Sequence, residues 1–422
     1  MIRTLVKVTR SPLFLGLLNQ AIVSLGAFAF NLTVARALPI ADYGLTALML
    51  SVMVFLNAIH QSLITYPLSI GVTTASPVDI PAMKSIAILQ TLALCAPFTA
   101  AIAFVAASHA DWGLFLSASA ALIAWQIQEV IRRTLLALGR YWRATLGDCI
   151  RYLGAFGLAI GASLADSLSP NAVFIMIAAA AMLATAVTFR GTKQWRFPSR
   201  LQLKEGWKSQ AKMGLPAFWA TLFGSFPIPW FLWLLTFKEG LASAAILQAL
   251  INVASIGRPV ALGMENILVP EIARQRSNIS FQDLMKFLLH CGVIGAILMF
   301  PLFAIVVFAP RSTLALLYGS NSPYTEFPSQ LQILMCIFMA YPAAVIIAAT
   351  LKAYNANEGL IKMQLYPAVC ALLFGTWVIM ELGLVGVCLA WVGSAFIGTV
   401  VGTRYLSRIR TITLQRVPSM DV

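Results

Sequence analysis

The stretch Arg190–Lys212, RGTKQWRFPSRLQLKEGWKSQAK, is the longest polar interruption in a chain that is otherwise almost entirely apolar. The stretch contains a single acid, Glu205. Its basic residues are Arg190, Lys193, Arg196, Arg200, Lys204, Lys208 and Lys212. Basic segments between membrane spans stay in the cytoplasm. The stretch therefore predicts a cytoplasmic linker over residues 190–212, between an N-terminal lobe (1–189) and a C-terminal lobe (213–422). Its aromatic and leucine residues would also suit a helix on the bilayer surface, so a surface helix and a solvated linker both stay open.

Composition defines the broad class. Hydrophobic residues make up 60% of the chain and charged residues only 10%, far from the balance of a soluble domain. The net charge of +14 would suggest nucleic acid in a soluble protein, but here membrane topology explains it, and we expect no nucleic-acid partner. The six cysteines fall in or beside apolar runs without metal-ligand spacing. We therefore expect no metal, no cofactor and no disulfide framework.

The apolar runs predict an all-α polytopic membrane protein with about twelve transmembrane helices in two six-helix lobes. No cleaved signal peptide is expected, because the first apolar run is too long for one. The predicted spans are 12–36, 43–69, 82–107, 112–136, 143–165, 170–189, 211–236, 241–267, 285–309, 328–352, 358–380 and 382–406.

The distribution of basic residues predicts the orientation of these spans. Loops assigned to the outer face hold only Arg36, Lys238 and Arg311, whereas the inner loops hold nearly all other lysines and arginines. This asymmetry places both termini in the cytoplasm. With six spans per lobe, both lobes begin on the same face, which permits a parallel repeat of the kind found in several transporters.

Polar residues inside the spans are candidates for a transport pathway, since they are costly in the membrane and usually face the bundle interior. In the first span Gln20 and Asn31 share a face that leads to Arg36. In the second span Asn57, His60 and Gln61 also share one helical face. Hydrogen bonding between helices is the alternative role for each of them. We assign these residues, with Asn252, Arg151 and Arg258, to substrate binding.

Charged residues lie in the cytoplasmic half of their spans. Glu129 is spaced to pair with Arg132 or Arg133, although both arginines could extend to the interface, and Asp148 precedes Arg151 by three residues. Glu129 and Asp148 are the candidates for ion or proton coupling. Arg258 is expected to be buried, with no acid one turn away. Arginine matches phosphate with its planar fork, so a cavity lined by these cations would suit an anionic lipid headgroup.

The sequence VARALPIADYG at Val34–Gly44 resembles the first connection of polysaccharide flippases, the Wzx-like branch of the multidrug/oligosaccharidyl-lipid/polysaccharide (MOP) exporter superfamily, with Pro39 in place of a glycine. Further similar segments follow in the order typical of that branch: RRTLLALGRYWRATLGD at Arg132–Asp148, GRPVALGMENILVPEIAR at Gly257–Arg274, LYGSNSPYTE at Leu317–Glu326 and GLVGVCLAWVGS at Gly383–Ser394.

The resemblance implies a MATE-like, two-lobed bundle in the bacterial inner membrane. It would move an undecaprenyl-pyrophosphate-linked oligosaccharide to the outer leaflet by alternating access, with glycosyltransferases or a polymerase of the same pathway as partners. Arg258 is the best counterpart of the cavity arginines that bind the pyrophosphate in relatives. One alternative is a cation-coupled drug exporter of the same superfamily, which should carry acids in its first spans. A second is a membrane-embedded glycan polymerase or ligase, which should carry a long external loop. A third is a non-transporting scaffold, against which the continuous polar stripes argue. We expect a transporter and no enzyme.

Overall fold

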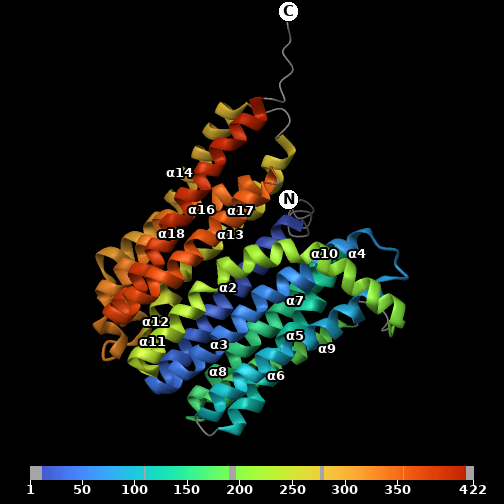
Figure 1. Cartoon of the computed structure of the whole chain (residues 1–422). Helices are drawn as coiled ribbons and strands as arrows, with labels where there is room; N and C mark the ends of the chain where they lie inside the picture. The colour runs from blue at the N-terminus through green and yellow to red at the C-terminus, as the bar shows by residue number, and fades with distance from the viewer. Residues whose placement is uncertain (1–11, 109–110, 190–195, 276–279, 355, 415–422) are drawn as a thin grey trace, which may run out of the picture. The chain divides into compact units, whose positions relative to one another are not determined.

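The computed structural model describes residues 12–108, 111–189, 196–275, 280–354 and 356–414, in which every regular element is helical. These residues fall into two compact units, 1–225 and 226–422. Figure 1 shows the first unit in blue to green and the second in yellow to red. Residues 190–195 of the predicted linker lie outside the described part of the chain.

The first unit ends with a long helix that was expected to divide between linker and C-terminal lobe. Its elements are α2 (Pro12–Ala37), α3 (Ile40–His60), η1 (Gln61–Thr65), α4 (Tyr66–Thr74), α5 (Ile80–Ser108), α6 (Trp112–Ala137), α7 (Tyr141–Asp148), η2 (Cys149–Leu153), α8 (Gly154–Leu164), α9 (Pro170–Phe189) and α10 (Arg200–Ser225). Residues 213–225 belong here because Gly214 packs against the backbone of Ser62 and Leu63, so closely that a Cβ would lie 2.9 Å from the Ser62 carbonyl oxygen.

The second unit has its own core. Its elements are α11 (Pro227–Glu239), α12 (Leu241–Ala254), η4 (Ser255–Gly257), α13 (Arg258–Gln275), α14 (Phe281–Phe308), α15 (Pro310–Tyr318), η5 (Pro323–Glu326), α16 (Pro328–Ala353), α17 (Asn357–Cys370), η6 (Ala371–Gly375) and α18 (Thr376–Leu414). Leu268, Leu284 and Ala349 pack together between α13, α14 and α16. The side chain of Ser280 caps α14 by accepting the Asp283 N–H at 3.1 Å.

The predicted membrane crossings are confirmed. Ten helical segments in the described residues are long and apolar enough to span a bilayer. One of them, Asn357–Ser407, has 51 residues and divides at Gly383, whose φ of 57° and ψ of −130° interrupt the helix. The predicted span 143–165 corresponds to α7, η2 and α8, which are not among those ten segments. Each of the twelve expected spans coincides with helical residues of the described chain.

Two of the three π-helical turns in the described chain lie in the first unit, at Gln61–Thr65 and Cys149–Leu153. A π turn inserts one extra residue and changes the direction of the side chains that follow, and such turns are frequent at functional sites. The first turn directly follows His60 and the second directly follows Asp148. Both polar residues were singled out from the sequence, and each turn changes the direction of the side chains that follow it.

Candidate functional site: a buried charge network in the first unit

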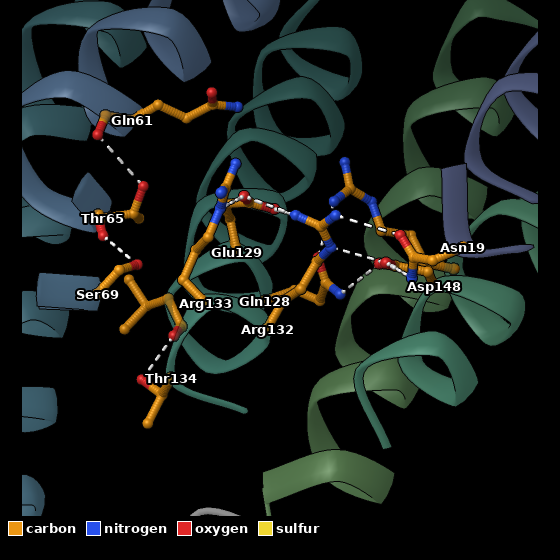
Figure 2. Close-up of polar contacts among 12 residues, drawn as sticks. Asn19, Gln61, Thr65, Ser69, Gln128, Glu129, Arg132, Arg133, Thr134 and Asp148 are labelled. Carbon is orange, nitrogen blue, oxygen red and sulfur yellow. Dashed lines mark hydrogen bonds and ion pairs between the residues drawn. The ribbon is translucent and has the colours of Figure 1, made fainter. Parts of the chain in front are cut away.

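The central element of the site is α6, which presents an acid and two bases to the interior of the first unit. Arg133 Nε donates to Glu129 Oε1 at 2.7 Å, and Arg132 Nη1 donates to the same oxygen at 3.1 Å. Glu129 is 4% exposed. Figure 2 shows its carboxylate held between the two guanidinium groups. The predicted pairing of Glu129 at both spacings is confirmed, so the two arginines do not simply extend to the interface.

Arg132 also connects α6 to α7. Its Nε donates to Asp148 Oδ2 at 2.6 Å, and its Nη2 approaches Asn19 Oδ1 of α2 at 3.4 Å. Asp148 is fully buried and accepts a second hydrogen bond from Asn19 Nδ2 at 2.6 Å and a third, longer one from Gln128 Nε2 at 3.4 Å. Three helices are therefore joined at one carboxylate (Figure 2). Such multiple donors are what a buried carboxylate requires.

Arg151 lies in η2 and is 5% exposed. Its Nη1 donates to Gln128 Oε1 at 2.7 Å, and its guanidinium lies over the rings of Trp125 and Tyr152, with its central carbon 4.5 and 4.7 Å from their centroids. Aromatic faces stabilise a desolvated cation. The expected i+3 pairing of Arg151 with Asp148 is wrong. The π turn changes the direction of Arg151, and Asp148 pairs with Arg132 instead.

The network carries more positive than negative charge. Its two carboxylates, Glu129 and Asp148, are both engaged by Arg132 or Arg133. Arg151 is held by neutral partners only. Among the described residues Arg151 takes part in no ion pair, so the three arginines outnumber the two carboxylates by one positive charge. An excess of positive charge favours an anion over a cation.

His60 is fully buried in the last turn of α3, in the same unit. Its Nε2 lies 2.8 Å from Thr91 Oγ1, while the Thr91 hydroxyl donates to the Ala87 carbonyl at 2.7 Å. Since the hydroxyl proton is already used, the imidazole must be the donor, with its own proton on Nε2. Among the residues that the structure describes, the opposite nitrogen, Nδ1, is buried without a hydrogen-bond partner. The same holds for Asn57 Oδ1, one turn earlier in α3.

The remaining predicted residues of the first unit do not join this network. Gln20 donates to Ser24 and Asn31 to the Ala27 carbonyl, each within α2. Gln61 is half-buried, and its carbonyl accepts from Thr65 within the first π turn. Arg36 is exposed in the last turn of α2. Hydrogen bonds of this local kind are typical of polar side chains in membrane helices.

Arg258 is not buried, contrary to the sequence-based expectation. It begins α13 directly after the 3₁₀ turn Ser255–Gly257, and its side chain is exposed. The turn breaks the stripe expected from regular helical spacing. Asn252 is 8% exposed and accepts from Gln248 at 3.0 Å. A pairing of Arg258 with Glu129 or Asp148 is not needed to explain either acid, since both have arginine partners within the first unit.

Three residues of this region were missed in the sequence. Asn19 has no distinguishing signal, because its partner Asp148 is 129 positions away. Trp125 shares a helical face with Gln128 and Arg132, at spacings of three and four, which could have indicated their common role. Lys84 was assigned to a cytoplasmic loop, but it lies inside α5, fully buried, with its Nζ 4.5 Å from the centroid of the Phe189 ring.

Neither a protein-family model nor a curated protein sequence matches the chain. Among solved structures, an inward-facing multidrug resistance MATE family transporter of the MOP superfamily aligns with a TM-score of 0.63 at 16% identity, over 94% of this chain and 96% of that one. A MOP superfamily transporter from Pyrococcus furiosus, described as having a binding pocket of reversed polarity, aligns with a TM-score of 0.67 at 14% identity over 95% of each chain. The chain therefore has the fold of MOP superfamily transporters, as expected from the sequence.

Proposed function

We propose that this protein is a flippase. It moves an undecaprenyl-pyrophosphate-linked oligosaccharide from the cytoplasmic to the outer leaflet of the bacterial inner membrane by alternating access, for surface polysaccharide assembly. The observation that carries the proposal is the positive excess of the buried network, in which Arg151 has only neutral partners. A diphosphate is the complementary charge, and arginine is the side chain whose donors match it best.

The state of the two acids separates this proposal from a cation-coupled drug exporter. A carboxylate that binds and releases a coupling ion needs a coordination position open to that ion. Glu129 and Asp148 have their oxygens occupied by arginine and amide donors. Their role in this proposal is to orient Arg132 and Arg133. The first three predicted spans hold no acid, and Asp42, in the first turn of α3, lies just before the second of them.

The exposed arginines would complete the recognition of the diphosphate. Arg36 ends α2 in the first unit and Arg258 begins α13 in the second. In an alternating-access cycle each unit would engage the headgroup by its own arginines. We place both termini in the cytoplasm and expect the glycosyltransferases or the polymerase of the pathway as partners.

A deletion strain that lacks redundant flippases tests the proposal. In spheroplasts of that strain, an external lectin should no longer reach the lipid-linked glycan, and the plasmid-borne chain should restore access. Arg151→Gln should fail to restore it at normal protein levels. The matched control is Arg274→Gln, which removes an exposed arginine of α13. Unchanged lectin access in the deletion strain would refute the proposal.

A further inference from the structure

The first half of α10 has a defined start and a fixed rotation. Ser199 Oγ accepts the Gln202 N–H at 3.2 Å, and Gln202 Oε1 accepts the Ser199 N–H at 3.0 Å. This reciprocal capping box begins the helix at Arg200. Gly206 packs on Ile86 and Gly214 on the backbone of η1, so one face of α10 is turned to the first unit. The opposite face is exposed, and its orientation is determined by these contacts.

The exposed face carries a row of cations four residues apart, here called the cationic ladder: Arg200, Lys204, Lys208 and Lys212. Within the described residues, none of the four takes part in an ion pair. Among the other exposed cations of the described residues, Arg274 and Lys286 pair with an acid one turn away, whereas Arg258 and Arg311 form no ion pair. Glu205 lies one turn before Lys208 but does not pair with it. Like charges at this spacing destabilise a helix, so the ladder is suited to an external anion.

Apolar side chains border the ladder. Leu201 is 65% and Trp207 46% exposed, in a helix that becomes apolar enough to cross the membrane only from Ala217. A shallow groove of about 270 Å³ lies among Arg200, Leu203, Lys204 and Trp207. Tryptophan favours the headgroup level of a bilayer, and clusters of basic residues beside a span bind anionic lipid. The groove combines both properties.

We propose that the cationic ladder and Trp207 form a binding surface for anionic phospholipid headgroups of the bilayer. Arg200 and Lys204 contact the headgroup phosphate in the groove, and the indole ring lies beside the glycerol and upper acyl chain. Lys208 and Lys212 continue the contact along the helix. This surface is independent of the transported substrate and would hold the first half of α10 at the membrane surface.

The test is a titration of the detergent-solubilised full-length protein with dioctanoyl phosphatidylglycerol, with dioctanoyl phosphatidylcholine and inorganic phosphate as separate arms. Each basic residue near an anionic surface contributes about fivefold to binding. Lys204→Gln with Lys208→Gln should therefore weaken phosphatidylglycerol binding roughly 25-fold. The matched control is Arg274→Gln with Lys286→Gln, which also removes two exposed cations but leaves the ladder intact, and it should change affinity less than about twofold.

Phosphatidylcholine should bind much more weakly than phosphatidylglycerol, and binding of the anionic lipid should weaken steeply with added salt. Equal affinity of the ladder variant and the wild type would overturn the proposal. Inorganic phosphate binding as tightly as the lipid would also overturn it, because the apolar part of the surface would then contribute nothing. An equal loss in the control pair would assign the effect to net charge and contradict a defined surface.

Discussion

Replacement of Asp148 by asparagine should destabilise the first unit strongly. The carboxylate is fully buried and takes hydrogen bonds at 2.6 Å from both Arg132 Nε and Asn19 Nδ2. Removing one partner of a buried ion pair typically costs about 3–5 kcal/mol, because the other charge stays behind. In a unit of this size that corresponds to a fall in melting temperature of roughly 6–20 °C. The assay is thermal unfolding of the purified protein, followed by intrinsic fluorescence.

A double-mutant cycle separates the pair from other effects. Asp148→Asn combined with Arg132→Gln should lose clearly less stability than the sum of the two single changes, since the double variant strands no charge. Asp283→Asn is the matched control, because its partner Lys286 lies 3.6 Å away on an exposed surface, and such a pair contributes at most about 1 kcal/mol. Additive losses in the cycle, or a melting temperature of Asp148→Asn within about 2 °C of wild type, would refute the reasoning.

Three further predictions concern packing, hydrogen bonding and topology. Gly214→Ala should cost about 1–3 kcal/mol of unfolding free energy, because the new Cβ would meet the backbone of η1. Thr91→Val should lower the melting temperature, because it leaves the His60 Nε2–H without an acceptor, a loss of about 1–3 kcal/mol. Cysteines introduced at Ser199 and Ser312, in a background that lacks the exposed Cys336, should be labelled from opposite sides of the membrane.

Each of these has an outcome that contradicts it. Gly157→Ala adds the same methyl group where no neighbouring atom lies within 4 Å, so a loss equal to that of Gly214→Ala would exclude close packing as the cause. Thr99→Val removes an exposed hydroxyl of the same helix and should have little effect. Labelling of both introduced cysteines from one side would contradict the arrangement of spans.

The helices were predictable because each apolar run is long enough to cross a bilayer, and the runs are separated by charge. The pairs within α6 were predictable as well, since Glu129 reaches Arg132 and Arg133 along a single helix. The partners of Asp148 were not predictable. They are on α2 and α6, and only the tertiary fold brings Asn19 and Arg132 to the Asp148 carboxylate. The i+3 spacing suggested Arg151 as the ion-pair partner of Asp148. The π turn after Asp148 points the Arg151 side chain in another direction.

The error at Arg258 has a similar cause. Regular helical spacing placed it on a stripe with Asn252, deep in a span. The chain instead makes a 3₁₀ turn at Ser255–Gly257 and begins a new helix at Arg258, whose side chain is exposed. The compact units of the structure divide between residues 225 and 226, within the span of residues 211–236 that hydropathy detects, and Gly214 packs on η1 of the first unit. Local rules predicted the elements, and contacts between elements determined the site.

The most direct test of the account is transport by the reconstituted protein. Proteoliposomes would carry a lipid-linked oligosaccharide diphosphate in both leaflets, and an external glycosidase would report its transfer from the inner to the outer leaflet. The account predicts transfer faster than in protein-free vesicles, a much slower rate with Arg151→Gln and a wild-type rate with Arg274→Gln. No acceleration of glycan transfer, together with gradient-driven transport of a cationic dye by the same vesicles, would contradict it.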